Sequence, residues 1–153
     1  MSLVKTGRFV GKFRHNLDEK GRLTMPAAWR PDVESSANAF LALPISDGSI
    51  AIYPPKMAAK LEEAIAQVPL EDAEGQMAVT ELLDGAQDLS CDKQGRIKLN
   101  DSLIEGANLK KGAVLLGKVA TFSIYSEELY ESMLAGKPTD KAARAAIFKR
   151  FGI

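Results

Sequence analysis

A short motif occurs twice in this 153-residue chain, and this repeat limits the possible folds more than any other feature. The segment Asp18-Glu-Lys-Gly-Arg-Leu-Thr-Met-Pro26 returns 74 positions later as Asp92-Lys-Gln-Gly-Arg-Ile-Lys-Leu-Asn100, with Asp, Gly and Arg in register. Farther along, Ile50-Ala-Ile-Tyr53 is matched by Phe122-Ser-Ile-Tyr125 at an offset of 72. Self-similarity at a fixed spacing indicates a duplicated structural unit. The chain is therefore predicted to be a tandem duplication.

The two repeats are predicted to span residues 8–86 and 87–153, and each begins with a strand, a tight turn and a second strand. Gly21 and Gly95 supply the backbone freedom that a hairpin turn needs, and the Asp that opens each motif can accept hydrogen bonds from turn amides. The residues after each turn alternate polar and apolar, which is the period of a half-buried strand. Two further apolar strands follow in each repeat.

Helices are predicted where the period of the apolar residues changes. Two prolines open the first helix, because proline is tolerated in a first turn whose amides lack partners. Ser126 precedes two glutamates and can cap the corresponding helix of the second repeat. The four predicted helices, two after the strands of each repeat, cover residues 56–67, 71–86, 127–134 and 139–151.

Charge is distributed unevenly along the chain, although the formal net charge is zero. Residues 1–30 hold seven basic and two acidic side chains, whereas residues 31–90 hold two basic and eleven acidic ones. Residues 91–124 carry a net +3 and the remainder +1. This pattern permits an anionic partner on one face, but an ordinary scatter of surface charge explains it equally well.

Cysteine and histidine usage argues against an enzyme or a metal protein. The single Cys91 cannot form an internal disulfide, and with the single His15 it cannot build a structural zinc site. A Cys–His pair meeting in space is the one nucleophilic arrangement left open. Trp29 is expected in the core or at a subunit contact. No apolar run is long enough for a membrane span or a secretory signal, so we expect a cytoplasmic protein. No cofactor is expected.

The duplicated Asp-x-x-Gly-Arg turn with its alternating strand resembles the swapped-hairpin DNA-binding domains of the AbrB, or SpoVT-AbrB, type. The double copy with interleaved helices resembles the MraZ family in particular, over nearly the whole chain. The segments that carry this resemblance are Asn16-Leu-Asp-Glu-Lys-Gly-Arg-Leu-Thr-Met-Pro26 and Cys91-Asp-Lys-Gln-Gly-Arg-Ile97. The resemblance implies a mainly β fold with helices, in which two tandem swapped-hairpin motifs form one intramolecular double-psi-like β-barrel.

The resemblance also implies a function. It points to a sequence-specific, nucleoid-associated transcription regulator, expected to repress the division and cell-wall gene cluster by binding short direct promoter repeats in double-stranded DNA. It further implies a homo-oligomeric ring, with no membrane and no small-molecule substrate. Two alternatives stay open: an AbrB-like antitoxin or protein-binding module, and a small enzyme that uses a cleft of the barrel.

DNA recognition needs cations at phosphate spacing for affinity and a forked donor such as Arg for guanine. By the resemblance, Arg22 and Lys20 at the first turn are the leading candidates for base or phosphate contacts. Three residues before this turn are candidates for backbone phosphates, and a fourth is a further possible contact; these are Arg14, Lys12, Arg8 and His15.

A structural role is the alternative for both motif arginines. Arg22 could pair with Asp18 and Arg96 with Asp92, and either ion pair would hold its turn closed. For Arg96 we prefer this interpretation, because Gln94 replaces the lysine of the first turn. The residues assigned to turn structure are Asp18, Gly21, Asp92, Gly95 and Arg96.

Overall fold

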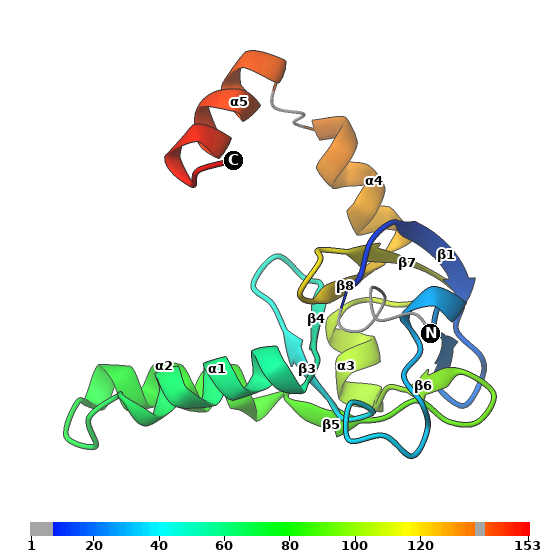
Figure 1. The fold of residues 1–153 in the computed structure, drawn as a ribbon, viewed down its shortest axis with the longest axis horizontal. Coiled ribbons are helices and arrows are strands. Elements are labelled where there is room, and N and C mark those ends of the chain that lie inside the picture. Colours follow the sequence, from blue (N-terminus) through cyan, green and yellow to red (C-terminus); the bar gives the residue numbers. More distant parts are fainter. Residues whose placement is uncertain (1–7, 137–139) are drawn as a thin grey trace.

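The protein is described here by a computed structural model that covers residues 8–136 and 140–153 (Figure 1). The first repeat contributes β1 (Lys12–Asn16), β2 (Arg22–Thr24), the 3₁₀ helix η2 (Ala27–Trp29), β3 (Phe40–Pro44), β4 (Ile50–Tyr53), α1 (Pro55–Ala66) and α2 (Ala73–Asp84). The second contributes β5 (Gln87–Leu89), β6 (Arg96–Lys98), α3 (Asp101–Gly106), β7 (Gly112–Gly117), β8 (Phe122–Ser126), α4 (Glu127–Gly136) and α5 (Lys141–Arg150). Two helices thus follow the strands of each repeat. Thr139, the predicted start of the last helix, lies outside the described residues.

The strands of the two repeats are interleaved. A six-stranded antiparallel sheet has the order β1-β7-β8-β4-β3-β5, and β2 and β6 form a separate two-stranded ribbon. The β2–β6 pairing is centred on Leu23 and Ile97, and the β4–β8 pairing on Ala51 and Ser123. These pairs are separated by 74 and 72 residues, which are the offsets of the sequence repeat. The repeats are therefore related by an internal pseudo-twofold axis.

The predicted closed barrel is not formed by the described strands. The hydrogen-bonded ladder starts at β1 and stops at β5, so the sheet is open and the fold is mixed α and β. The reason lies in the motif turns. Each turn leads the chain out of the sheet into a three-residue strand, and only single bridges, Leu17 to Leu23 and Cys91 to Ile97, link that strand back across its own turn. The double-psi topology stays a prediction.

The main core lies between the ribbon and one face of the sheet. Leu23 and Ile97 point inward from the ribbon and are fully buried. Trp29 packs among aromatic rings, with centroids 5.6 Å from Phe9 and 4.9 Å from Phe122. Its Nε1–H donates to the carbonyl of Val10 at 3.3 Å, which satisfies the one polar group of the indole. The structure thus places the only tryptophan in the core.

Helices cover the opposite face of the sheet. Tyr130 of α4 packs with Val114 and Tyr125 in a second, smaller cluster. Helix α1 lies over β3 and β4 in the other half of this face. Together α1 and α2 form an arm that projects from the sheet, and α5 stands apart beyond α4 (Figure 1). No residue of α1, α2 or α5 is buried. No helix in the described ranges is long and apolar enough to cross a membrane.

The two repeats differ after the ribbon strands, and one substitution explains the difference. Asn100 stands where the first repeat has Pro26. The Oδ1 atom of Asn100 accepts a hydrogen bond from the Leu103 N–H at 2.8 Å and so caps α3. Proline has no such oxygen, and the first repeat forms only the short η2 there. Helix α3 was not predicted from the sequence.

We expect Phe122→Ala to lower the free energy of unfolding by roughly 3–5 kcal/mol, because it leaves a cavity in a fully packed site. Phe122 is completely buried against three aromatic side chains. Urea denaturation would measure the loss. Leu70→Ala is the control, since Leu70 is 86% exposed and should change stability by less than about 0.5 kcal/mol. Equal losses for the two variants would contradict this description of the core.

Candidate nucleic-acid interface

The turn of the first repeat is closed by the carboxylate of Asp18. Its Oδ1 accepts hydrogen bonds from the backbone N–H groups of Lys20 at 2.9 Å and Arg22 at 2.8 Å, and its Oδ2 accepts from Nε of Arg22 at 2.7 Å. Gly21 has a φ of +79°, the left-handed conformation that glycine adopts without steric cost. The Arg22 side chain, at the start of β2, is therefore held by Asp18 through its Nε atom.

Asp92 repeats this arrangement in the second copy, with one difference. Its Oδ1 accepts from the backbone N–H groups of Gln94 and Arg96, both at 2.9 Å. The Nε of Arg96 lies 3.3 Å from Oδ2 of Asp92, but this buried nitrogen has no hydrogen-bond partner among the described residues. The second ion pair is thus looser than the first, and Nη2 of Arg96 donates instead to Oε1 of Gln94 at 3.4 Å.

The two turns are tied together across the ribbon. The N–H of Leu99 donates to the carbonyl of Gly21 at 2.9 Å, and the N–H of Met25 donates to the carbonyl of Gly95 at 2.8 Å. A Cβ on Gly21 would lie 2.7 Å from the carbonyl oxygen of Leu99, so no side chain fits there. Gly21 is thus required for the contact between the repeats as well as for its own turn.

The outer face of the ribbon collects cations from both repeats. Since Leu23 and Ile97 face the core, their neighbours on each strand point the other way. We call these outward residues the ribbon face: Arg22, Thr24, Arg96 and Lys98. Sequence reasoning missed Lys98. The signal was the alternation after the second turn, which gives Lys98 the position that Thr24 has in the first repeat.

Two carboxylates border the ribbon face and stay charged at neutral pH. The hydrogen bond from the Arg22 backbone N–H is the main reason that the pKa of Asp18 lies below its usual 3.8. The backbone N–H of Arg96 lowers the pKa of Asp92 in the same way. Nη1 of Arg96 also lies 3.9 Å from Oδ2 of Asp18, which connects the charges of the two repeats. Three cations therefore face two carboxylates.

The cations of β1 lie on the other side of the sheet. Lys12 and Arg14 pair with Leu116 and Val114, whose side chains pack under α4. The Lys12 Nζ lies 5.3 Å and the Arg14 Cζ 5.8 Å from the centroid of the Tyr130 ring, within cation–π range. The sequence grouped Lys12 and Arg14 with Arg22, but the alternation of β1 turns them toward α4.

The remaining candidates are dispersed. Lys20 is exposed at the tip of the first turn, beside Arg22. Arg8 is exposed near the start of the described chain. His15 is half-buried on the ribbon side of the sheet, where it pairs with Ala113. The structure therefore brings Arg22 and Lys20 together and separates both from Lys12 and Arg14.

Both ion pairs expected under the structural interpretation of the arginines are formed: Arg22 with Asp18, and Arg96 with Asp92. The pairing side chains of Arg22 and Asp18 are 31% and 36% exposed, and an exposed pair of this kind contributes at most about 1 kcal/mol. Among the described residues, only Nε of the Arg22 guanidinium has a hydrogen-bond partner. The Asp18–Arg22 pair thus orients the guanidinium and adds little to the stability of the fold.

Acidic side chains are numerous elsewhere, but they do not converge. Among the residues that the structure describes, no group of three or more His, Cys, Asp and Glu side chains is placed to hold a metal ion. Cys91 is buried, and this burial raises the pKa of its thiol. The candidate site of the described chain is therefore the ribbon face, where cations of both repeats meet.

Comparison with known proteins gives a consistent result. A family model described as "MraZ protein, putative antitoxin-like" matches residues 9–80 and 82–150. A protein of Natranaerobius thermophilus named "Transcriptional regulator MraZ" is 36% identical over 124 residues, which cover 81% of this chain and 85% of the relative. Proteins of the same name are 36% identical over 135 residues in Heliobacterium modesticaldum (88% and 89% covered) and 29% identical over 145 residues in Halothermothrix orenii (95% and 99% covered).

The lowered pKa values make a prediction about stability and pH. In the folded protein, Asp18 and Asp92 hold their protons less tightly than in the unfolded chain, so their stabilising effect is present at neutral pH and is lost as pH falls through the lowered values. The double variant Asp18→Asn, Asp92→Asn should be less stable than wild type at pH 7, and this difference should shrink below about pH 4.

Urea denaturation between pH 7 and pH 3 would measure this. Asp32→Asn, a change at an exposed loop carboxylate, is the control and should leave the pH dependence as in wild type. A stability difference that stays constant over the whole pH range would mean that the carboxylate charges do not stabilise the turns.

Proposed function

The chain belongs to the MraZ family, and from this premise we propose that it is a sequence-specific DNA-binding regulator of transcription. The observation that carries the proposal is the ribbon face, where both repeats present cations on one two-stranded ribbon. A ribbon of this width fits the major groove of B-DNA. The repeats then act as one reading surface instead of two separate ones.

We assign different tasks to the cations of this surface. Asp18 holds Nε of Arg22, so the guanidinium is oriented before DNA arrives while its other N–H groups can reach guanine O6 and N7. Lys20 and Lys98 are exposed on either side of Arg22 and serve backbone phosphates. Arg96 is a further contact from the second repeat, because it shares the ribbon face.

Lys12, Arg14, Arg8 and His15 remain candidate contacts of a second kind. They do not share the ribbon face. A DNA groove that contacts Arg22 therefore cannot contact Lys12 and Arg14 in the same way, because these two side chains lie on the other side of the sheet. We propose that these residues add long-range attraction to phosphates at the sides of the groove. Removing them should alter affinity for all DNA sequences alike.

The remaining functional proposals follow from the family resemblance. We propose that the protein is nucleoid-associated in the cytoplasm and represses the division and cell-wall gene cluster by binding short direct promoter repeats. We further propose a homo-oligomeric ring whose subunits each meet one DNA repeat, with residues 8–86 and 87–153 as the two units of each subunit. Linking several weak contacts raises the total affinity without any new contact, which suits an operator made of repeats.

Replacing Arg22 by Ala should abolish sequence preference. Loss of one bidentate contact costs about 1–3 kcal/mol, so we expect binding to the division-cluster promoter of the source organism to weaken by roughly 10- to 100-fold. Fluorescence anisotropy with that promoter and with scrambled DNA, over a salt series, would measure it. Arg22→Lys is the matched control: it keeps the charge and hence the affinity for scrambled DNA, but it loses the fork. Unchanged preference in Arg22→Ala would contradict the assignment.

Lys98→Ala tests the contribution of the second repeat. Removing one phosphate contact should weaken binding to both DNAs equally and reduce the slope of log affinity against log salt by about 1. Lys60→Ala, a charge loss on the arm away from the ribbon, should leave the slope unchanged. Equal slopes for Lys98→Ala and wild type would mean that Lys98 contacts no phosphate.

A second candidate function is a protein-binding module of antitoxin type. The observation in its favour is the exposed apolar surface of α5, where Phe148 and Ile147 are 40% and 37% exposed. Under this alternative, the helix becomes stable only with a partner. Limited proteolysis of dilute protein should then cleave α5 rapidly while the sheet resists. A protected α5 at concentrations too low for self-association would argue against it.

A further inference from the structure

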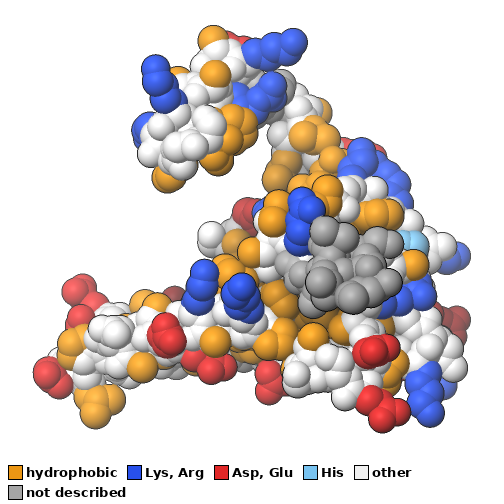
Figure 2. All heavy atoms as spheres, in the orientation of Figure 1, with side chains coloured by type: hydrophobic (Ala, Val, Ile, Leu, Met, Phe, Trp, Pro, Cys, Tyr) orange, Lys and Arg blue, Asp and Glu red, His pale blue; other side chains and the backbone are white. Residues whose placement is uncertain are grey.

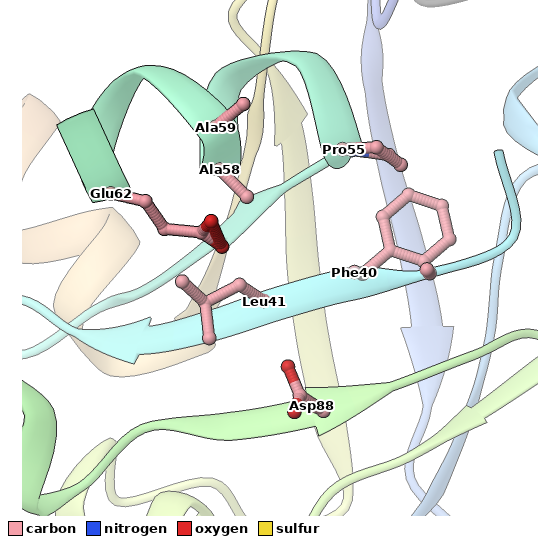
Figure 3. Close-up of a pocket in the computed structure, with 8 residues that line it drawn as sticks. Phe40, Leu41, Pro55, Ala58, Ala59, Glu62 and Asp88 are labelled. Atoms are coloured by element: carbon pink, nitrogen blue, oxygen red, sulfur yellow. The ribbon is translucent and has the colours of Figure 1, made fainter. Parts of the chain in front are cut away.

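An apolar hollow opens between α1 and the sheet in the first repeat. It has a volume of about 230 Å³, and Leu41 of β3 forms its floor, with Phe40 also among the lining residues. Ala58 lines it from α1, where its short side chain leaves the space above Leu41 open. Figure 3 shows two carboxylates at its rim, Glu62 from α1 and Asp88 from β5 on the other side of β3.

The equivalent space in the second repeat is filled. Through the 72-residue offset of β4 and β8, position 58 corresponds to Tyr130 of α4. The Tyr130 ring packs on Val114, and Tyr130 is only 8% exposed. Val114 corresponds to Leu41 of β3, because Val114 pairs with Tyr125 and Leu41 pairs with the equivalent Tyr53. The fold therefore has one position that accepts an aromatic ring in each repeat. Only the second repeat supplies the ring itself.

The charges around the two positions are opposite. Over Tyr130 lie the cations Lys12 and Arg14 of β1. In the first repeat, the 74-residue offset puts Asp88 where Arg14 stands, and Glu62 adds a second carboxylate. The first repeat has alanine at the position of Tyr130 and no cation among the residues that line the hollow, so an aromatic ring followed by a cation would complement it.

We propose that Phe151 of a second copy of this chain fills the hollow, with Arg150 of that copy facing Glu62 and Asp88. Phe151 is 70% exposed at the end of α5, and the Arg150 Cζ lies 5.7 Å from its ring centroid. Like Tyr130 with Lys12 and Arg14, this pair combines an aromatic ring with a cation. A hollow of about 150 Å³ is known to hold a benzene ring, so the space suffices.

Charge complementarity extends beyond the hollow. The arm and the strand after it, residues 55–88, carry eight acidic and two basic side chains, whereas residues 141–153 carry four basic and no acidic ones. In Figure 2, acidic side chains are distributed along the arm and basic ones over α5. Opposite fields of this kind steer association and fix its orientation.

A second copy is the occupant because α5 stands clear of its own hollow. Helix α4 packs on β7 and β8 and runs away from the sheet, and α5 continues beyond its far end (Figure 1). Each copy then offers one hollow and one Phe151, and such a head-to-tail contact closes into a ring when the rotation between copies permits. The inference rests on the self-association proposed above and specifies its contact surfaces.

Filling the hollow from within tests the proposal. Ala58→Tyr should place a ring over Leu41 as Tyr130 does over Val114, and so exclude Phe151. We expect Ala58→Tyr and Phe151→Ala each to weaken self-association by at least about tenfold, as for loss of a buried aromatic anchor. Sedimentation velocity over a concentration series would measure it. The double variant should be no weaker than either single one, because both remove the same contact.

A charge exchange provides an independent arm of the experiment. Glu62→Arg and Arg150→Glu should each weaken self-association, and combining them should restore it in part. Glu63→Arg makes the same charge change one residue away, outside the hollow, and should weaken self-association less than Glu62→Arg, because it alters only the long-range field. Val33→Ala removes an exposed apolar side chain elsewhere and should associate like wild type. All these positions are exposed or half-exposed, so folding should be retained, and circular dichroism would check it.

The outcomes separate this inference from the proposed function. If Ala58→Tyr and Phe151→Ala self-associate as strongly as wild type, the proposed contact is wrong. The same result is expected if Phe151 fills the hollow of its own chain, so that case is also excluded by a loss of self-association. A wild-type protein that stays monomeric at all concentrations overturns both the contact and the ring. Binding of a single-site DNA duplex depends on Arg22 and should be the same in Ala58→Tyr as in wild type. Its loss only in Arg22→Ala supports the ribbon face, whatever the result for the hollow.

Discussion

The pairing of β2 with β6 joins the two repeats and closes the core that they share. Each strand is only three residues long, and neither pairs with any other strand of the described chain. Two fully buried side chains, Leu23 and Ile97, and the hydrogen bonds that cross from one turn to the other hold them together. Because each strand comes from a different repeat, neither repeat can complete its core alone. The same contact presents the motif arginines on one surface, so folding and assembly of the candidate interface are one event.

Duplication within one chain allows the two copies to diverge, which identical subunits cannot do. The first turn keeps a short Arg–Asp hydrogen bond at 2.7 Å, whereas the second keeps a looser pair at 3.3 Å. Proline limits one repeat to a turn of 3₁₀ helix after the ribbon, and Asn100 starts a full helix in the other. A tyrosine covers one half of the helical face and an alanine leaves the other half open. The pseudo-twofold axis thus relates backbones more closely than it relates surfaces.

Much of the fold could be predicted from the sequence, because it depends on local patterns. The duplication is visible as a repeat in the sequence. Local residues also indicate the turns at Gly21 and Gly95, the alternating strands and the helices after each set of strands, because each is encoded within a few residues of where it forms. The open sheet was not predictable in this way. Whether β1 and β5 close a ladder depends on where the chain is led by turns 74 residues apart, and no local pattern contains that information.

The amino-acid sequence alone reveals which chemistry is available: paired Asp-x-x-Gly-Arg motifs, a basic first repeat and a family resemblance that the comparisons confirm. Which of these groups lie together depends on how the strands pair in the folded chain. Lys12 and Arg14 are close to Arg22 along the chain, yet they stand on the other side of the sheet, while Lys98 shares the face of Arg22 from the other repeat. The reason is that a strand sends successive side chains to opposite faces, and the partner strand determines which of the two faces is buried.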